Sequence, residues 1–170
     1  MDANELKSLQ APLKEKYRRQ PASALVTLRA TGRAAEGVAC SVETGKALVK
    51  AGLHPATGGD GTFVCSGDML LQALVACAGV TLRAVATSLG LDVHDAEVRA
   101  EGDLDFRGTL GVSREAPVGF RDIRLHFNLI GSLTEEERAT LIRLTEQYCV
   151  VLQTLRHAPP ITVSASADVA

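Results

Sequence analysis

The stretch SGDMLLQALVACAGVTLRAVATSLG, residues 66–90, decides the fold of this chain. Its two ends carry helix signals. Ser66 can cap the N-terminus, Asp68 then lies in the first turn, where the helix dipole favours a carboxylate, and Gly90 supplies the C-terminal stop. Between these ends nearly every face of the helix is apolar. This predicts a central helix that is surrounded by protein.

The segments outside this helix alternate in the manner of β-strands. Residues 23–30, 37–43 and 45–53 are separated by turn signals and predict three short strands of an antiparallel meander. Residues 95–106 and 120–130 place apolar side chains at every second position, as half-buried strands do. The sequence therefore predicts two groups of strands, one before and one after the central helix.

A second long helix follows these strands. Thr134 and Glu137 form a capping box, and apolar residues continue at helical spacing to about Arg156. Pro159 and Pro160 end the helix, and residues 161–169 can close the sheet as a last strand. The order of strands, helix, strands, helix and strand predicts an α+β fold with antiparallel sheets around two long helices.

Residues 1–21 are expected to form an N-terminal helical arm, and residues 22–170 a single domain. The arm is a polar helix over residues 4–20, interrupted by Pro12. It has no signal-peptide order of a basic and then an apolar segment, which indicates a cytoplasmic protein. The apolar run 69–82 is shorter than the roughly 20 residues of a membrane span, so no membrane partner is expected.

Composition argues against nucleic acid as a partner. The 170 residues include 18 Lys and Arg against 20 Asp and Glu, a formal net charge of −2, and no Trp. Such a chain has neither the basic field nor the stacking aromatics that nucleic-acid binding requires. A small-molecule role is favoured.

Two cysteines lie at depth in the predicted helices, Cys77 in the first and Cys149 in the second. Free cysteines are often packed as small core hydrophobes, and this interpretation stays open for both. The alternative is a pair of facing thiols, one attacking a peroxide and the other resolving the sulfenic acid to a disulfide. Packing is favoured for Cys40 and Cys65, of which Cys65 is the more reactive candidate.

Other motifs indicate neither a metal nor a cofactor. The cysteines form no CxxC pair, and the histidines show no HExxH spacing. The glycines of residues 57–62 do not form a phosphate-binding loop with lysine. His54 precedes the central helix and is a candidate for the mouth of a substrate pocket, although a solvated turn is the alternative.

The central helix resembles that of the OsmC/Ohr family, whose pattern is proline, a variable residue, an acidic residue, an apolar run and then cysteine. Here Asp68 is the acidic residue and Cys77 the cysteine, while Gly67 stands where typical Ohr enzymes have glutamate. The stretch EQYCVVLQTLRHAPPITV, residues 146–163, is similar to the second cysteine helix and terminal strand, which puts Cys149 at the second thiol position. The resemblance spans about residues 22–168 and is closer to the broad OsmC-like branch than to Ohr.

This resemblance implies an intertwined homodimer that reduces organic hydroperoxides in oxidative stress defence, with an external dithiol as reductant and no bound cofactor. It implies catalytic roles for Cys77, Cys149 and Asp68, and for Arg33, expected in a turn of the N-terminal strands, with Arg29 as the fallback. A neighbouring arginine favours the thiolate that attacks the peroxide. A non-enzymatic alternative is the binding of a small hydrophobic ligand in a pocket at the dimer interface.

Overall fold

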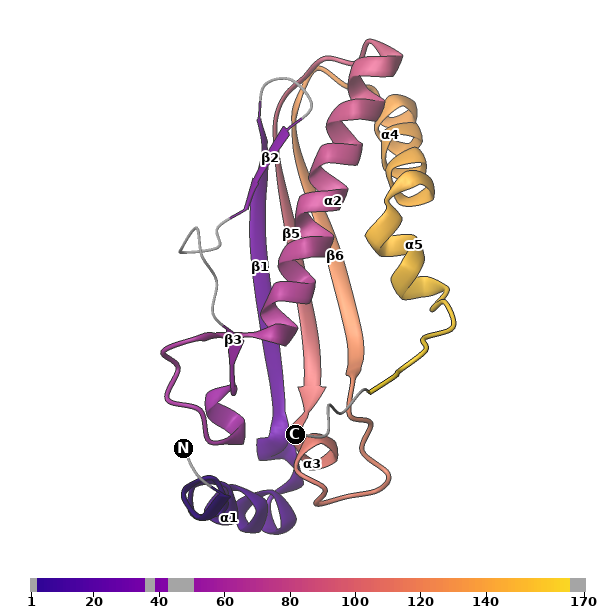
Figure 1. Ribbon diagram of the computed structural model, residues 1–170. Coiled ribbons are helices and arrows are strands. Elements are labelled where there is room, and N and C mark those ends of the chain that lie inside the picture. The colour runs from indigo at the N-terminus through magenta and orange to yellow at the C-terminus, as the bar shows by residue number, and fades with distance from the viewer. Residues whose placement is uncertain (1–2, 36–38, 43–50, 166–170) are drawn as a thin grey trace, which may run out of the picture.

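The computed structural model describes residues 3–35, 39–42 and 51–165, with the backbone alone over 3–7, 9 and 28–42. Three long antiparallel strands form an elongated sheet, and helices cover one of its faces (Figure 1). The elements in chain order are α1 (Ala3–Arg19), η1 (Pro21–Ala24), β1 (Leu25–Ala35), β2 (Ala39–Val42), β3 (Ala51–Gly52), η2 (Pro55–Thr57), β4 (Val64–Cys65), α2 (Ser66–Leu89), β5 (Val93–Asp105), α3 (Phe106–Thr109), β6 (Phe120–Gly131), α4 (Glu135–Tyr148) and α5 (Val150–Arg156).

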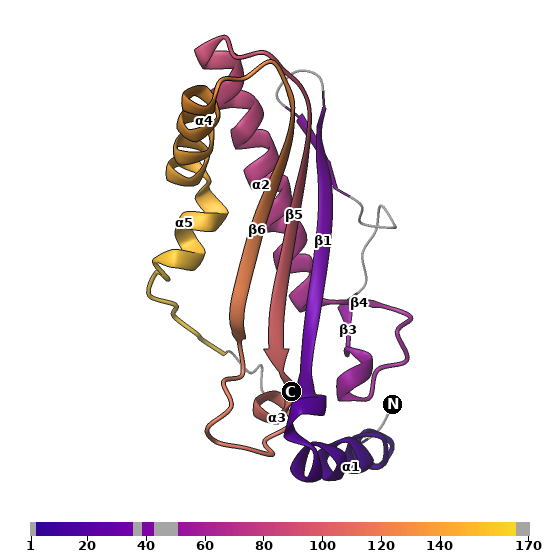
Figure 2. The ribbon, with the colours of Figure 1, turned by 180° about the vertical axis from the view of Figure 1, so that it is seen from behind.

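The main sheet has the strand order β2-β1-β5-β6, and every neighbouring pair is antiparallel. Seen from behind, the other face of the sheet carries no helix of the described chain (Figure 2). A strand with one buried face alternates apolar and polar residues. β5 shows this alternation, with Val98, Ala100 and Leu104 buried toward the helices.

The α2 helix packs along this sheet and provides the core. Leu71, Leu74 and Val75 are fully buried and share one apolar cluster with the buried side chains of β5. Burying a leucine or valine side chain contributes about 2 kcal/mol each. Among the described residues, α2 is the helix whose length and apolar composition would suit a membrane span, but its buried side packs on the sheet.

Close packing within the sheet needs one glycine. A Cβ atom on Gly102 would lie 2.5 Å from the ring of Phe120 on the neighbouring strand. Any side chain at position 102 would therefore push Phe120 out of its place beside α2. Gly90 meets a different requirement, because its φ of 65° ends α2 in the left-handed conformation.

Two local expectations from the sequence differ from the structure around α2. The N-cap of α2 is Cys65 in an extended conformation, and Ser66 is already helical, because the chain arrives from strand β4. One side of α2 is open in this chain, where Met69, Leu70 and Val80 are 36–38% exposed. α2 is therefore not surrounded by protein on every face.

The predicted N-terminal strands are only partly confirmed. β1 and β2 form the antiparallel hairpin, but β3 pairs in parallel with β4 and is no third strand of a meander. Residues 45–50 of that predicted strand lie outside the described residues. α1 runs as one helix from Ala3 to Arg19 with Pro12 inside it, so the predicted interruption at Pro12 is not found.

The C-terminal part also differs from expectation. The capping box of Thr134 and Glu137 is present, but α4 ends at Tyr148 and a separate helix begins at Val150. Within the described residues up to 165, the predicted last strand has no partner strand, and Ile161 and Val163 are 82% and 89% exposed. The remainder of that segment lies outside the described residues.

Candidate functional site

Cys77 lies near the middle of α2, on the boundary between its buried and open sides. It is partly buried and packs against the core cluster that includes Leu74 and Ala78. The middle of a long helix has no unsatisfied backbone N–H groups, so the helix terminus does not act on this thiol. Its environment is therefore set by the side chains and helices that contact it.

Cys149 occupies the break between α4 and α5 and is fully buried. Its φ of −71° and ψ of 104° are extended, so it serves as C-cap of one helix and N-cap of the next. Its backbone N–H donates to the carbonyl of Thr145 at 2.9 Å, and its own carbonyl accepts from the N–H of Gln153 at 2.9 Å. Both helices therefore terminate on this residue.

A buried hydroxyl one turn earlier contributes to the break. The Thr145 hydroxyl donates to the carbonyl of Leu141 at 2.8 Å, and neither residue is exposed. A threonine that bonds back to the carbonyl four residues earlier bends a helix. Leu141, Thr145 and Cys149 follow one another at intervals of four residues and share the buried face of α4.

The two thiols belong to one apolar cluster although 72 positions separate them in the sequence. Burial above all, and then the neighbouring Cys77 thiol, raise the pKa of Cys149 to about 11, against the effect of the Leu152 and Val151 N–H groups. Cys149 is therefore held as a neutral thiol. A negative charge on Cys77 makes removal of the Cys149 proton harder.

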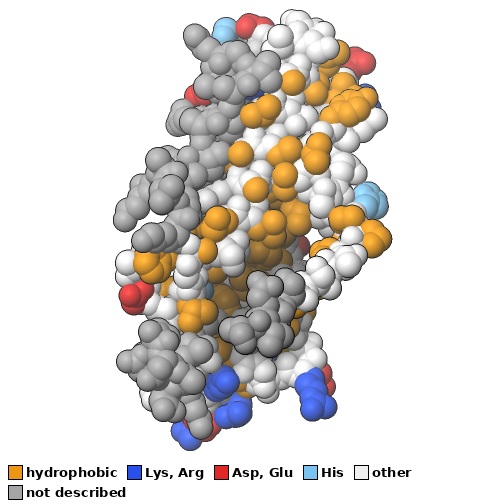
Figure 3. Space-filling model, in the orientation of Figure 1, with side chains coloured by type: hydrophobic (Ala, Val, Ile, Leu, Met, Phe, Trp, Pro, Cys, Tyr) orange, Lys and Arg blue, Asp and Glu red, His pale blue; other side chains and the backbone are white. Residues whose placement is uncertain are grey.

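A cavity of about 400 Å³ lies between β6 and α5, and neither Cys77 nor Cys149 is among the residues that line it. Figure 3 shows hydrophobic side chains gathered around a hollow on this face of the molecule. Leu74 and Leu152 belong to its lining, and each is three residues from one of the thiols, about one helical turn. The remaining apolar lining comes from Phe120, Ile123, Leu125, Phe127 and Leu155.

Charged side chains from three elements surround this cavity: Arg121, Asp122, Glu146 and Arg156. Asp122 is paired with Arg124 at 2.6 Å, and Glu146 with Arg156 at 2.8 Å. The apolar lining was visible in the sequence as the alternation of β6, which predicts a half-buried strand. The cavity also needs α5 on its other side, and the sequence carries no signal for the position of α5 relative to β6.

His54 and Asp68 both lie near the base of α2, away from the thiols, and each shifts the pKa of the other. The His54 ring stacks on Phe106 with a centroid distance of 4.9 Å, and its Nδ1 accepts from the N–H of Ala56 at 3.0 Å. Burial lowers the pKa of His54 while Asp68 raises it, and burial raises the pKa of Asp68 while His54 lowers it. Asp68 precedes Cys77 by nine residues, about 14 Å along the helix axis. Within one chain, these two residues form a separate pair.

The arginine expected in a turn lies in a strand. Arg33 belongs to β1, where it faces Ser41 of β2 and Glu97 of β5, because β1 continues through Gly32 with partners on both sides. Arg29 lies in the same strand opposite Glu101. The side chains of both arginines are outside the described part of the structure. Among the described residues, no three His, Cys, Asp or Glu side chains gather in a metal-binding group.

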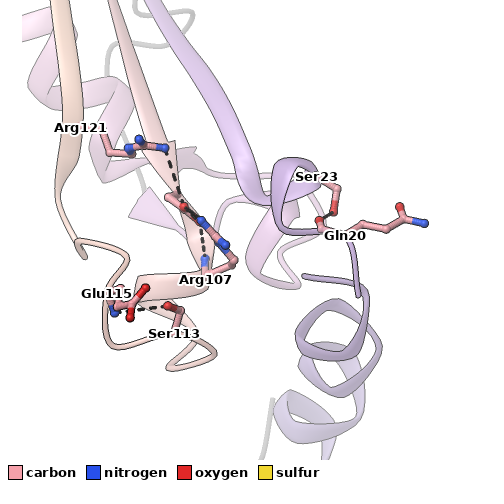
Figure 4. A network of polar contacts seen from close by, with 7 residues as sticks. Gln20, Ser23, Arg107, Ser113, Glu115 and Arg121 are labelled. Carbon is pink, nitrogen blue, oxygen red and sulfur yellow. Dashed lines mark hydrogen bonds and ion pairs between the residues drawn. The ribbon is translucent and has the colours of Figure 1, made fainter. Parts of the chain in front are cut away.

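Charged groups that the sequence did not single out hold the base of the domain. Asp105 is 1% exposed and accepts from the Nε and Nη2 of Arg107, and Arg121 lies 4.0 Å from the same carboxylate. Figure 4 shows both arginines reaching toward this point. The hydrogen bond from Arg107 is the largest cause that lowers the pKa of Asp105.

The N-terminal arm closes the same end of the domain. Tyr17 is 2% exposed in the core, and its hydroxyl donates to the carbonyl of Ala56 at 2.6 Å. Gln10 reaches the next carbonyl, of Thr57, at 3.3 Å. α1 is therefore docked on the turn that carries His54. In the sequence this docking was indicated only by Tyr17, an aromatic residue in a charged helix.

The fold and the thiol pair define a class, an α+β domain in which a cysteine on a central helix meets a second cysteine at a helix break. The family model of OsmC-like proteins matches residues 59–164, more than half of the chain. The chain belongs to the OsmC-like family, which confirms the family and fold expected from the two cysteine motifs.

Solved structures share this fold at low sequence identity. An OsmC-like hydroperoxide resistance protein from Jannaschia sp. CCS1 superposes with a TM-score of 0.61 and 21% identity over 85% of this chain and 95% of that one. An OsmC-like protein from Mycoplasma pneumoniae gives a TM-score of 0.55 and 16% identity over 79% and 86%. No curated protein matches the chain.

Proposed function

We propose that this protein is a thiol-dependent peroxidase that reduces organic hydroperoxides through Cys77 and Cys149. The observation that carries the proposal is that the two thiols share one apolar cluster, with Cys77 partly accessible in α2 and Cys149 buried at the break after α4, where Cys77 raises its pKa. Structural packing alone does not require two cysteines from distant segments to meet. A two-step oxidation does require it.

The chemistry balances with the two thiols and one hydroperoxide. The Cys77 thiolate attacks the distal oxygen, the O–O bond breaks, and the alkoxide leaves and takes a proton to become an alcohol. Cys77 is then a sulfenic acid. The Cys149 sulfur attacks the sulfenic sulfur, a disulfide forms, and the hydroxyl group leaves with the Cys149 proton as water. The peroxide gains two electrons and the thiol pair loses two.

Two further groups belong to this proposal. Arg33 of β1 would favour the Cys77 thiolate and orient the peroxide, and Asp68 with His54 would act from the base of α2. Because the Asp68–His54 pair is remote from Cys77 within one chain, its action on the thiol would need the homodimer. The open apolar side of α2, with Met69, Leu70 and Val80, supports a second copy of the chain as the partner.

The substrate and reductant follow from the surroundings of the thiols. The apolar cavity one turn from each cysteine suits the organic group of a hydroperoxide. A second thiol pair on an external dithiol would reduce the disulfide by thiol–disulfide exchange. Such a cycle belongs to oxidative stress defence in the cytoplasm, where thiols are kept reduced.

The test is intact mass and peptide mapping after one equivalent of cumene hydroperoxide is added to the reduced protein. We expect a loss of about 2 Da and a Cys77–Cys149 crosslink. Cys149→Ser should trap the sulfenic acid on Cys77, and Cys77→Ser should not consume peroxide. Cys65→Ser is the matched control and should behave as the native protein. Equal peroxide consumption by Cys77→Ser would reject the proposal.

The cavity also supports a second candidate function, the binding of a small hydrophobic ligand without turnover. Seven apolar side chains line about 400 Å³, within the size range of ligand pockets. Native mass spectrometry should then detect a retained apolar molecule, and Ile123→Trp should displace it by filling the cavity. Purified protein that retains nothing and binds no member of a lipid panel would count against this function.

A further inference from the structure

The break at Cys149 is bridged by side chains from both helices. Glu146 lies in the last turn of α4, whose carbonyl groups have no regular partner inside the helix. Its carbonyl accepts from the Nε2 of Gln153 at 2.7 Å, and its carboxylate accepts from the Nη2 of Arg156 at 2.8 Å. Both donors belong to α5, so one residue of α4 is held by two residues of α5. These three residues form the Glu146 clamp.

Both contacts depend on the break. In a continuous helix, side chains meet at separations of three or four residues. Gln153 follows Glu146 by seven positions and Arg156 follows it by ten, which would be about 10 and 15 Å along a straight helix axis. Neither pair is a regular helix neighbour. The clamp therefore exists only while the chain is bent at Cys149.

The clamp is also close to the chemistry. Glu146 precedes Cys149 by three residues, and the Cys149 carbonyl accepts from the N–H of Gln153. Gln153 is thus bonded to Cys149 through its backbone and to Glu146 through its side chain. Glu146 and Arg156 in addition line the cavity between β6 and α5.

We infer that Gln153 and Arg156 are positioning residues that hold the bend at Cys149 and thereby set the rate at which Cys149 closes on an oxidised Cys77. This inference rests on the proposed peroxidase cycle and assigns residues to its second step. The Arg156–Glu146 ion pair is expected to contribute less to holding the bend than the Gln153–Glu146 hydrogen bond. Arg156 and Glu146 are 50% and 40% exposed, so water and salt weaken their pair, whereas the Gln153 bond is partly buried.

The experiment separates the two chemical steps by rapid mixing with cumene hydroperoxide. Dimedone labelling of Cys77 in the Cys149→Ser background measures the first step, and acid quenching followed by mass analysis measures disulfide closure. Gln153→Met keeps the length of the side chain and removes its donor. We expect it to slow closure about fivefold, the effect of one hydrogen bond, with an unchanged first step.

Arg156→Met should slow closure by about twofold or less, and added salt should slow the native protein toward that rate. The charge reversal Glu146→Arg with Arg156→Glu should restore the native rate. Gln147→Met is the matched control, because Gln147 is exposed in the same turn of α4. It should leave both steps at their native rates.

Each outcome decides the inference. Equal closure rates in native protein and Gln153→Met, or equal slowing by Gln147→Met, would overturn it while the peroxidase cycle stands. If Gln153 only supported the fold, Gln153→Met would slow both the oxidation of Cys77 and the closure of the disulfide, and this result would overturn the inference. If Gln153→Met does not fold, Arg156→Met and the double variant Glu146→Arg with Arg156→Glu test the inference instead. Closure at the native rate in Arg156→Met, or no recovery in the double variant, would then overturn it. If peroxide does not oxidise Cys77 in the native protein, the proposed function fails first and the inference with it.

Discussion

The middle and the base of α2 are built from opposite kinds of contact. Around Cys77 and Cys149 the neighbours are leucine, valine and phenylalanine side chains, and burial is the largest cause that raises the pKa of Cys149. At the base, Asp105 is equally buried, but hydrogen bonds from Arg107 lower the pKa of that carboxyl. Burial therefore raises the pKa of both acids, but at Asp105 the hydrogen bonds from Arg107 outweigh it.

The difference shows which end of the helix is built for reaction. An acid whose charge is fixed by a bidentate arginine stays ionised and stabilises the fold. A thiol that is kept neutral by an apolar environment, next to a second thiol, retains a proton that a reaction can use. The base of the molecule is thus a structural anchor, and under the proposed function the helix break is the reactive region.

The largest expected difference is in thiol reactivity. At pH 8, a pKa of about 11 leaves about one Cys149 in a thousand as thiolate, and the residue is fully buried. Iodoacetamide should therefore alkylate Cys77 about 100-fold faster than Cys149 in the folded protein, measured by peptide mapping over time. In urea the two rates should become equal. Equal rates in the folded protein would remove the distinction between the two thiols.

Removal of the buried carboxylate tests the other region. Asp105→Ala should lower the free energy of unfolding by about 3 kcal/mol, because it leaves Arg107 without its partner and removes the cap of α3. Urea denaturation followed by circular dichroism measures this. Asp122→Ala, at a side chain that is 59% exposed, should cost less than about 1 kcal/mol. Similar losses in both variants would contradict the anchor role of Asp105.

Alkaline pH should weaken the fold through Cys149. Because the folded pKa of about 11 is above the unfolded value of about 8.5, the stability contribution is complete below pH 8.5 and is lost as the pH rises toward 11. Denaturation curves at several pH values should fall more steeply across this window for the native protein than for Cys149→Ala. Parallel curves would show that Cys149 ionises with its ordinary pKa.

The smallest effect is expected where the arm docks. Tyr17→Phe removes one hydrogen bond to the Ala56 carbonyl and should lower stability by about 1 kcal/mol. Limited proteolysis should cut α1 sooner in this variant, while the alkylation rates of the thiols stay unchanged. Tyr148→Phe, at an exposed tyrosine, provides the control. A change in the thiol rates would show that the base and the reactive region are coupled.

Several elements could be predicted from the sequence because their signals are local. Gly90 ended α2, the capping box of Thr134 and Glu137 began α4, and the period-two alternation of residues 95–106 and 120–130 became β5 and β6. Each of these features depends on backbone geometry over a few residues. Tertiary contacts did not override them.

The break at Cys149 could not be predicted in this way. Apolar residues keep helical spacing through Leu144, Tyr148 and Leu152, so the pattern predicts one continuous helix. The bend is supported by Thr145 bonding back to Leu141 and by the Glu146 clamp, which are contacts of the folded chain. The docking of α1 was hidden for the same reason, since its partner turn is about 40 residues away in the sequence.

By itself, the sequence determined the family through the resemblance of its two cysteine motifs, and it determined the central helix with Cys77 and the strands β5 and β6 through short-range periodicity. Only the tertiary structure decided that Cys77 and Cys149 share one apolar cluster, that Cys149 lies buried at a helix break with a raised pKa, and that Asp68 lies near His54 at the base of the helix. The physical reason is that proton affinity and reactivity depend on burial and on neighbours in space.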